Sequence, residues 1–179
     1  TKTRAQVLRM GLETLRQAAG PEVELLGCGV PLGSGLGIFD AMRIGADVAQ
    51  RWLPEWNGRD FFFPNEPNMP STRNALQNTL TRAFMHRRWW VNVPDCLLIR
   101  PDSQLTLAEV QSLATAIALS GGAMLLSDDL PNVPPERLRI AQQLLPLIGK
   151  TPRVLDWFDE PMPRLVRLDL EKETGPWHL

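Results

Sequence analysis

Apolar residues recur at helical spacing in four stretches of the chain. A spacing of three or four residues places side chains on one face of a helix, so each stretch predicts an amphipathic helix. Ser71 in front of the second stretch, and Thr106 with Glu109 at the start of the third, are typical helix-capping residues. The predicted helices cover residues 3–19, 71–84, 106–120 and 134–145.

Short apolar runs between these helices predict β-strands. Each run is bounded by glycine, proline or polar residues, as is usual where a strand ends. Strands that alternate with helices along a chain pair in parallel, with the helices as crossover connections. The sequence therefore predicts an α/β fold with a parallel sheet. Its strands are expected at residues 23–26, in the first part of 42–48, at 89–93 and at 123–126.

Two segments depart from this alternation. Residues 52–70 show no apolar period and contain Pro54, Pro64, Pro67 and Pro70, so they predict a long loop, which inside a domain is often functional. Beyond Thr151, residues 154–157 and 165–170 resemble strands, and the second alternates apolar and polar side chains. We therefore expect two regions, an α/β region over residues 1–150 and the start of an antiparallel β region over residues 151–179.

The composition describes a protein that can bury a core and carries almost no net charge. The chain has 179 residues, 44% of them hydrophobic, and a formal net charge of −1. A balanced charge lacks the basic footprint of proteins that bind nucleic acid. No run of about 18 apolar residues exists, so we expect no membrane span. No basic start leads into an apolar stretch, so no signal peptide is expected either.

The cysteine content points to a reducing compartment. Cys28 and Cys96 lie far apart in the sequence, each at the end of a predicted strand. Two cysteines are too few for a disulfide framework, and they cannot form a zinc site by themselves. We therefore expect reduced, half-buried thiols and a cytoplasmic protein.

Polar side chains follow all four predicted strands of the parallel sheet. In this architecture the carboxyl ends of the strands meet at one edge, which is where ligands bind and reactions occur. Each of these residues is equally compatible with a structural role, such as helix capping, so the pattern indicates a site without assigning its members. The candidates are Cys28, Arg43, Asp47, Asn92, Asp95, Cys96, Asp128 and Asp129.

Two further features favour structural roles. The glycine-rich stretch 33–37 is compatible with a phosphate-binding loop. It lacks both the spacing of a dinucleotide fingerprint and the Gly-Lys-Ser/Thr of a phosphate loop, so a plain strand-to-helix turn is the favoured interpretation. His86 lies among arginines at the end of a predicted helix, where a cation complements the helix dipole.

Four motifs of this chain resemble those of the melibiase-type α-galactosidases of glycoside hydrolase clan D, and they stand in the same order. They are residues 27–32 (GCGVPL), 40–47 (DAMRIGAD), 91–98 (VNVPDCLL) and 127–130 (SDDL). Members of this family have an eight-stranded (β/α) TIM-type barrel followed by an antiparallel β domain. The resemblance implies that residues 1–150 are the C-terminal half of such a barrel, strands five to eight, and that residues 151–179 begin the β domain.

The resemblance also implies roles for individual residues. Asp47, four residues after Arg43, matches the general acid/base of the family, and Arg43 matches a partner of the sugar or of a carboxylate. Asp95 and Cys96 are then expected to line the site, with Cys28 at the sugar subsite. The implied reaction is retaining hydrolysis of terminal α-galactosides, a carbohydrate being the partner. It needs neither a metal nor an organic cofactor.

The chain departs from the family pattern in two places. Val93 stands where the family has an aspartate, and the nucleophilic aspartate of the family ends strand four, which the resemblance places upstream of Thr1. We therefore expect the 179-residue chain by itself to be inactive, and to self-associate or to need its N-terminal half. The alternatives are a non-catalytic carbohydrate-binding or structural relative, and a small α/β module that binds a phosphorylated ligand.

Overall fold

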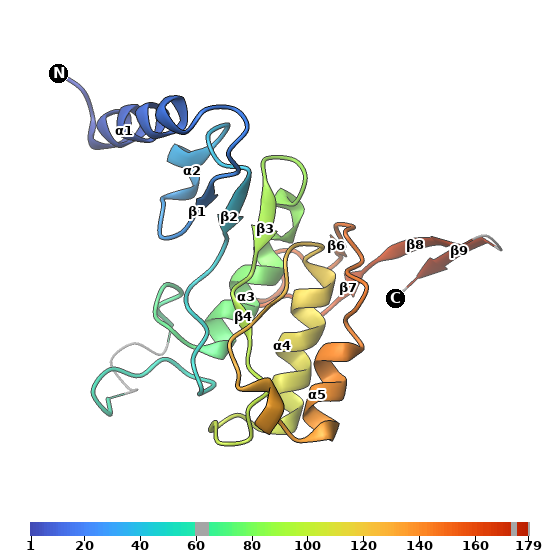
Figure 1. Ribbon diagram of the computed structural model, residues 1–179. Coiled ribbons are helices and arrows are strands. Elements are labelled where there is room, and N and C mark those ends of the chain that lie inside the picture. The colour runs from blue at the N-terminus through green and yellow to red at the C-terminus, as the bar shows by residue number, and fades with distance from the viewer. Residues whose placement is uncertain (60–64, 173–174, 179) are drawn as a thin grey trace.

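The computed structural model describes residues 1–59, 65–172 and 175–178, and it has the mixed α/β architecture that the sequence predicts (Figure 1). The described residues of the predicted loop 52–70 form no regular structure apart from one bridge between Trp56 and Arg59, which confirms the loop. Pro64, one of its four prolines, lies outside the described residues. Within the described ranges, no helix combines the length and apolarity needed to cross a membrane.

All four predicted helices are present, and their predicted caps are confirmed. Ser71 Oγ accepts a hydrogen bond from Asn74 N at 3.1 Å, and Thr106 and Glu109 form a reciprocal capping box. Two 3₁₀ turns, Ala83–Met85 and Leu130–Asn132, follow α3 and β5. The helices are α1 (Arg4–Ala19), α2 (Leu32–Gly35), α3 (Thr72–Arg82), α4 (Leu107–Leu119) and α5 (Pro135–Gln142). The glycine-rich stretch thus contributes a short turn of helix, α2.

The parallel strands are present but shorter than the apolar runs predicted. Strands β1 (Leu26–Gly27), β2 (Ala41–Arg43) and β3 (Val91–Val93) form one parallel sheet in that order. Strands β4 (Cys96–Leu97) and β5 (Leu125–Leu126) form a second parallel pair. The run at residues 23–26 was wrong as a strand for most of its length, because only its last residue enters the ladder.

The two parallel sheets are joined where β3 ends and β4 begins. Pro94 has no N–H to donate, and Asp95 has a left-handed backbone with φ of 82°. β3 pairs with β2 before this point, and β4 pairs with β5 after it. The sequence predicted one strand here and missed β4, because a proline usually ends a strand rather than interrupting it.

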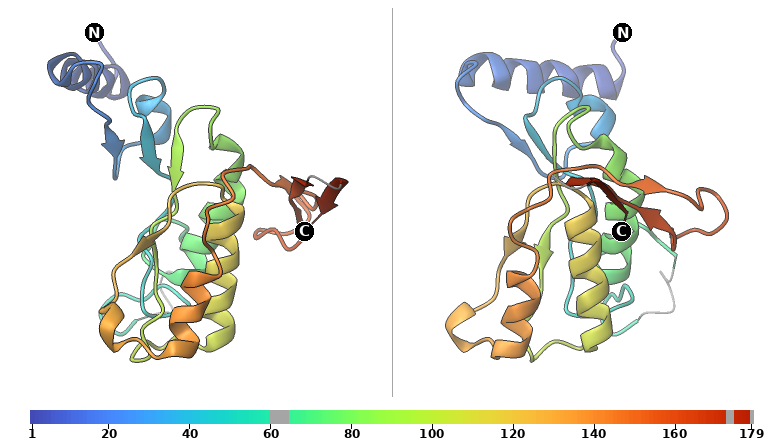
Figure 2. Two further views of the ribbon diagram at one scale, coloured as in Figure 1. Left: turned by 45° about the vertical axis from the view of Figure 1, so that its right-hand side comes forward. Right: turned by 90° about the vertical axis from the view of Figure 1, so that its right-hand side faces the viewer.

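Two hydrophobic clusters lie beneath these strands. Helices α3, α4 and α5 lie side by side (Figures 1 and 2), and the cluster under α4 centres on Leu97, Val110 and Leu113. The second cluster, under β1 and β2, includes Met42, Ile44 and Trp90. By contrast, α1 buries none of its residues and lies at the edge of the molecule.

The Gly-Gly pair after α4 has a steric cause. A Cβ atom at Gly122 would stand 2.0 Å from the carbonyl oxygen of Asn92 on β3, far inside van der Waals contact. Ala123 N donates to that same Asn92 oxygen at 2.9 Å, so the chain passes directly against β3 before it enters β5. Glycine is the one residue that allows this approach.

The C-terminal region is antiparallel, as the alternating pattern predicts. Strand β6 (Arg153–Val154) pairs with β7 (Val166–Arg167), and β8 (Asp169–Lys172) pairs with β9 (Gly175–His178), in a hairpin that extends away from the helices (Figure 2). The run 165–170 was wrong as one strand, since it divides between β7 and β8. A domain boundary near residue 150 stays a prediction.

Candidate functional site

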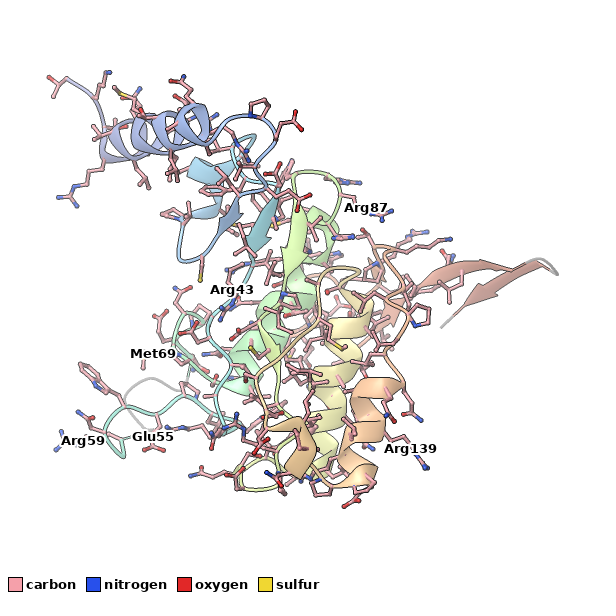
Figure 3. The ribbon with its side chains drawn as sticks, viewed as in Figure 1. Arg43, Glu55, Arg59, Met69, Arg87 and Arg139 are labelled. Atoms are coloured by element: carbon pink, nitrogen blue, oxygen red, sulfur yellow. The ribbon has the colours of Figure 1, made fainter. Side chains whose placement is uncertain are left out.

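Arg43 is the centre of a charged group at the carboxyl ends of β2 and β3. It is the last residue of β2, and Figure 3 shows it just beyond that strand. Its Nη2 lies 2.6 Å from Asp47 Oδ1 and 2.5 Å from Asp95 Oδ2. One guanidinium nitrogen therefore joins two carboxylates that come from different loops.

The two carboxylates differ sharply in exposure. The side chain of Asp47 is 71% exposed, whereas that of Asp95 is 10% exposed and that of Arg43 is 14% exposed. The Asp47 carboxylate is thus open to solvent while the largely buried Arg43 holds its Oδ1. A carboxylate oriented in this way can exchange a proton with a bound molecule, which is the requirement for general acid/base chemistry.

The buried Asp95 carboxylate links Arg43 to the loop that follows Asp47. Its Oδ2 accepts a hydrogen bond from Val48 N at 2.7 Å, in addition to the ion pair with Arg43. Aspartate is among the few residues other than glycine that tolerate a left-handed backbone, and Asp95 has one. Strained backbone at such positions persists where the surroundings fix it, and here both contacts of the carboxylate do so.

The two cysteines lie on opposite sides of Arg43. Cys28, directly after β1, is exposed, and its Sγ lies 3.9 Å from Arg43 Nη1, a weak contact. Cys96, the first residue of β4, is partly buried. Burial, together with the adjacent Asp95 carboxylate, raises the pKa of the Cys96 thiol. Both are free thiols.

An open cavity of about 370 Å³ lies beside this charged group. It contains four of the five residues predicted for the site, and its far wall comes from residues after β4 and β5. Its lining is Arg43, Asp47, Val48, Ala49, Gln50, Asp95, Cys96, Leu98, Arg100 and Ser127. Cys28 lies next to Arg43 without lining this cavity. The structure thus brings the predicted site residues together.

Two other strand-end candidates, for which the sequence left a structural role open, make structural contacts. Asn92 is buried within β3, where its Nδ2 donates to the carbonyl oxygen of Ala83 at 3.2 Å and its Oδ1 accepts from Trp90 Nε1 at 3.1 Å. The side chain of Asp128 is 0% exposed and accepts hydrogen bonds from Arg100 Nε and from a backbone N–H. Neither offers a free group to a ligand.

Val93 and Asp129 also lie apart from the cavity. Val93 is 3% exposed and stands opposite Arg43 in the ladder, and its carbonyl oxygen accepts from Ile44 N at 3.1 Å. Asp129 accepts a hydrogen bond from Asn132 Nδ2 at 2.7 Å. The valine therefore packs in the interior next to the site rather than in it.

Arg100 is a cavity residue that sequence reasoning missed. It follows β4 by three residues, so the strand-end rule would have included it had β4 been recognised. The predicted strand ended before Pro94, so only the residues directly after it, Asp95 and Cys96, counted as strand-end residues.

His86 is structural, as predicted, but not as a cation. It is buried, and its Nδ1 accepts a hydrogen bond from Asn92 N at 3.2 Å, which requires an unprotonated nitrogen. Burial and the charge of Arg87 lower its pKa. The expectation of a positive charge here was wrong, because Nδ1 serves as an acceptor and burial disfavours the imidazolium.

A larger cavity lies elsewhere among the described residues. It measures about 950 Å³ and lies against α3 and α4, where Leu76, Leu80, Ala116 and Met162 make its lining mainly apolar. No carboxylate lines it. The described residues also contain no cluster of three or more side chains that could hold a metal ion. Of these two cavities, only the one beside Arg43 is lined by carboxylates, those of Asp47 and Asp95.

The fold and site together define an α/β protein with a carboxylate–arginine site at the carboxyl ends of parallel strands. No protein-family model matches the chain. Its structure is similar to TtGalA, the α-galactosidase from Thermus thermophilus, in complex with p-nitrophenyl α-D-galactopyranoside, with a TM-score of 0.65 and 29% sequence identity over 81% of this chain. The stachyose complex of TtGalA matches with a TM-score of 0.65 and 31% identity over 76% of this chain.

These matches cover only part of the longer protein. The chain spans 29% of the length of TtGalA in both comparisons. The chain therefore has an α-galactosidase-like fold over a limited portion of such an enzyme, and the similarity supports a relationship to glycoside hydrolases.

Proposed function

We propose that this chain is the C-terminal half of the catalytic barrel of an α-galactosidase-like retaining glycosidase, strands five to eight, together with the start of a C-terminal antiparallel domain. The observation that carries the proposal is the exposed Asp47 carboxylate, held by the largely buried Arg43 beside a cavity, in a chain that is similar to TtGalA. TtGalA binds p-nitrophenyl α-galactoside and stachyose, so the proposed substrates are terminal α-galactosides.

Asp47 has two tasks in the proposed reaction. As an acid it protonates the glycosidic oxygen while a carboxylate from the N-terminal half attacks the anomeric carbon and forms a covalent glycosyl-enzyme. As a base it then removes a proton from the water that releases the sugar. Two inversions give net retention, and the two carboxyl groups would stand about 5–5.5 Å apart.

The neighbours of Asp47 orient it and bind the sugar. Arg43 fixes the direction of the Asp47 carboxylate through its Nη2 and has a second nitrogen near Cys28. Asp95 keeps Arg43 in place from the buried side. In this proposal Arg43 and Cys28 contact hydroxyl groups of the bound galactose, and Asp95 and Cys96 line the site next to it.

Substitution of Asp47 in the full-length protein tests the proposal. Asp47→Asn should lower kcat about 10²–10⁴-fold for substrates with poor leaving groups, which need protonation. The glycosylation step should suffer least for aryl galactosides, and azide should restore part of their turnover by replacing the activated water. Asp159→Asn, at an exposed carboxylate of the C-terminal region, is the matched control. Equal losses for both substrate classes, without azide rescue, would refute the acid/base role.

The 179-residue chain alone should lack activity and associate. β1 and β5 each have a strand neighbour on one side only among the described strands, and Leu26 and Leu125 on them are exposed. Such edges pair with other strands, either those of the N-terminal half or those of a second copy. Light scattering of the isolated chain should therefore show self-association, and adding the N-terminal half should abolish it. A monodisperse monomer that melts cooperatively would contradict the half-barrel assignment.

A further inference from the structure

Arg100 lines the same cavity as Asp47, on its far wall, and hydrogen bonds hold its guanidinium in place. Its Nε donates to Asp128 Oδ1 at 2.5 Å, and its Nη2 donates to the carbonyl oxygen of Ser127 at 3.0 Å. Asp128 in turn accepts from Ile99 N at 2.6 Å, and its side chain is fully buried. A second arginine, Arg137 on α5, donates to the carbonyl oxygen of Arg100 at 3.0 Å.

This support leaves part of the guanidinium available. Nη1 of Arg100 has no hydrogen-bond partner within the described residues, and the side chain, 28% exposed, lines the cavity. The other contacts lock the planar fork in one orientation, so little side-chain freedom is lost when a ligand binds. The arrangement is that of a preorganised hydrogen-bond donor.

The charges around the cavity favour a neutral ligand over an anionic one. The two arginines, Arg43 and Arg100, are outnumbered by the three carboxylates with which they pair, Asp47, Asp95 and Asp128. Because both arginines already pair with carboxylates, an anion would gain little from their charges, whereas hydroxyl groups of a sugar can accept from Nη1 of Arg100 and donate to carboxylate or carbonyl oxygens. Gln50 adds an amide to the same lining.

We propose that Arg100, held by Asp128, binds the leaving-group sugar of an oligosaccharide substrate on the side of Asp47 remote from Cys28. This inference rests on the proposed function. Cys28 contacts Arg43 without lining the cavity, and the cavity extends from Arg43 and Asp47 to Arg100 and Ser127. A general acid stands at the bond to be broken, so the cavity beyond it holds the portion that leaves.

The test uses the full-length protein with two substrates that share the galactose but differ in the leaving group. The leaving group of raffinose is the neutral disaccharide sucrose. The leaving group of p-nitrophenyl α-galactoside is p-nitrophenol, which has no sugar hydroxyls. The Arg100→Met variant removes the donor. Because it also leaves Asp128 buried without its cation, the double variant Arg100→Met/Asp128→Asn provides a neutral background that keeps the contact with Ile99 N. Arg139→Met, at an exposed arginine on α5 that does not line the cavity (Figure 3), is the control.

Loss of Arg100 should raise KM for raffinose at least tenfold more than KM for the aryl galactoside, in both the single and the double variant. Arg139→Met should change neither. Calorimetric titration with sucrose should show binding to the unaltered protein and at least tenfold weaker binding to the double variant. Equal effects on both substrates, or sucrose binding that survives the double variant, would overturn the assignment.

The two proposals fail separately. If the full-length protein hydrolyses no α-galactoside, the proposed function is refuted, and the sucrose titration alone decides the role of Arg100. If the protein hydrolyses the aryl galactoside but sucrose does not bind, the assignment of Arg100 is overturned while the proposed function stands.

Discussion

Two arginine–aspartate pairs at the strand ends of this protein have opposite arrangements. After β2, the arginine is largely buried and the aspartate is exposed: Asp47 is open to the cavity while Arg43 supports it. After β4 and β5, the aspartate is buried and the arginine faces the cavity: Asp128 supports Arg100. Sequence alone places both aspartates at strand ends and cannot separate them.

The difference shows that burial assigns the role within each pair. A buried charge must be paired and hydrogen-bonded, so it becomes the support, and its more exposed partner is the group left to meet a ligand. In the first pair the more exposed group is the Asp47 carboxylate, which is suited to proton transfer. In the second pair it is the Arg100 guanidinium, a donor that keeps its proton and is suited to binding.

The largest expected contrast is in stability. Asp128→Ala should lower the free energy of unfolding by about 2–4 kcal/mol, because Arg100 and a buried backbone N–H lose their acceptor. Asp47→Ala should change it by less than about 1 kcal/mol, since the pair is largely open to solvent on the Asp47 side. Urea denaturation of both variants measures this. Similar losses in the two variants would contradict the division of roles.

The loss of stability on substituting Asp95 should depend on whether the new residue tolerates the left-handed backbone. Asp95→Asn keeps an acceptor for Val48 N, tolerates the left-handed conformation and leaves Arg43 paired with Asp47, so the loss of its charge should cost only about 1 kcal/mol. Asp95→Ala loses the acceptor and suits that conformation poorly, and it should cost about 1–3 kcal/mol. Thermal unfolding in the same buffer compares them. An alanine variant as stable as the asparagine variant would remove the support role of Asp95.

The two thiols beside Arg43 should differ in their rates of alkylation. Cys28 is exposed, whereas burial raises the pKa of Cys96 and limits access to it. Iodoacetamide at pH 8 should therefore alkylate Cys28 about tenfold faster than Cys96. Mass spectrometry of peptides from a time course gives both rates, and Cys28→Ser identifies the faster site. Comparable rates would place Cys96 in an open environment.

The smallest effect concerns His86, at the end of β3 remote from both pairs. Its pKa in the folded protein lies below the ordinary value of 6.5, so the unfolded chain binds the proton more tightly. Between those two pKa values the unfolded state holds more protons, and the free energy of unfolding therefore falls as the pH drops below about 6.5. His86→Asn, which keeps an acceptor for Asn92 N, should reduce this fall. Denaturant midpoints at pH 7.5 and 5.5 are measured for both proteins. An equal decrease of the midpoint in both would exclude His86 as a contributor.

Local sequence features determined where the helices begin and how the strands pair. Ser71, Thr106 and Glu109 lie within one turn of the groups they cap, so their effect does not depend on distant residues. The alternation of helices with apolar runs likewise determined the parallel pairing. The strand-end rule collected Arg43, Asp47, Asp95 and Cys96, which line one cavity.

Only the tertiary structure decided which polar residue is buried and which partner it has. Asn92 and Asp128 satisfy the same sequence rule as Asp47, yet each is consumed by contacts with residues far away in the chain, such as Ala83 for the amide and Arg100 for the carboxylate. β4 and the cavity role of Arg100 also depended on a left-handed Asp95 that carries the chain past Pro94. Hydrophobic period and caps are local and can be read along the chain, whereas desolvation and charge pairing are properties of the space into which the chain folds.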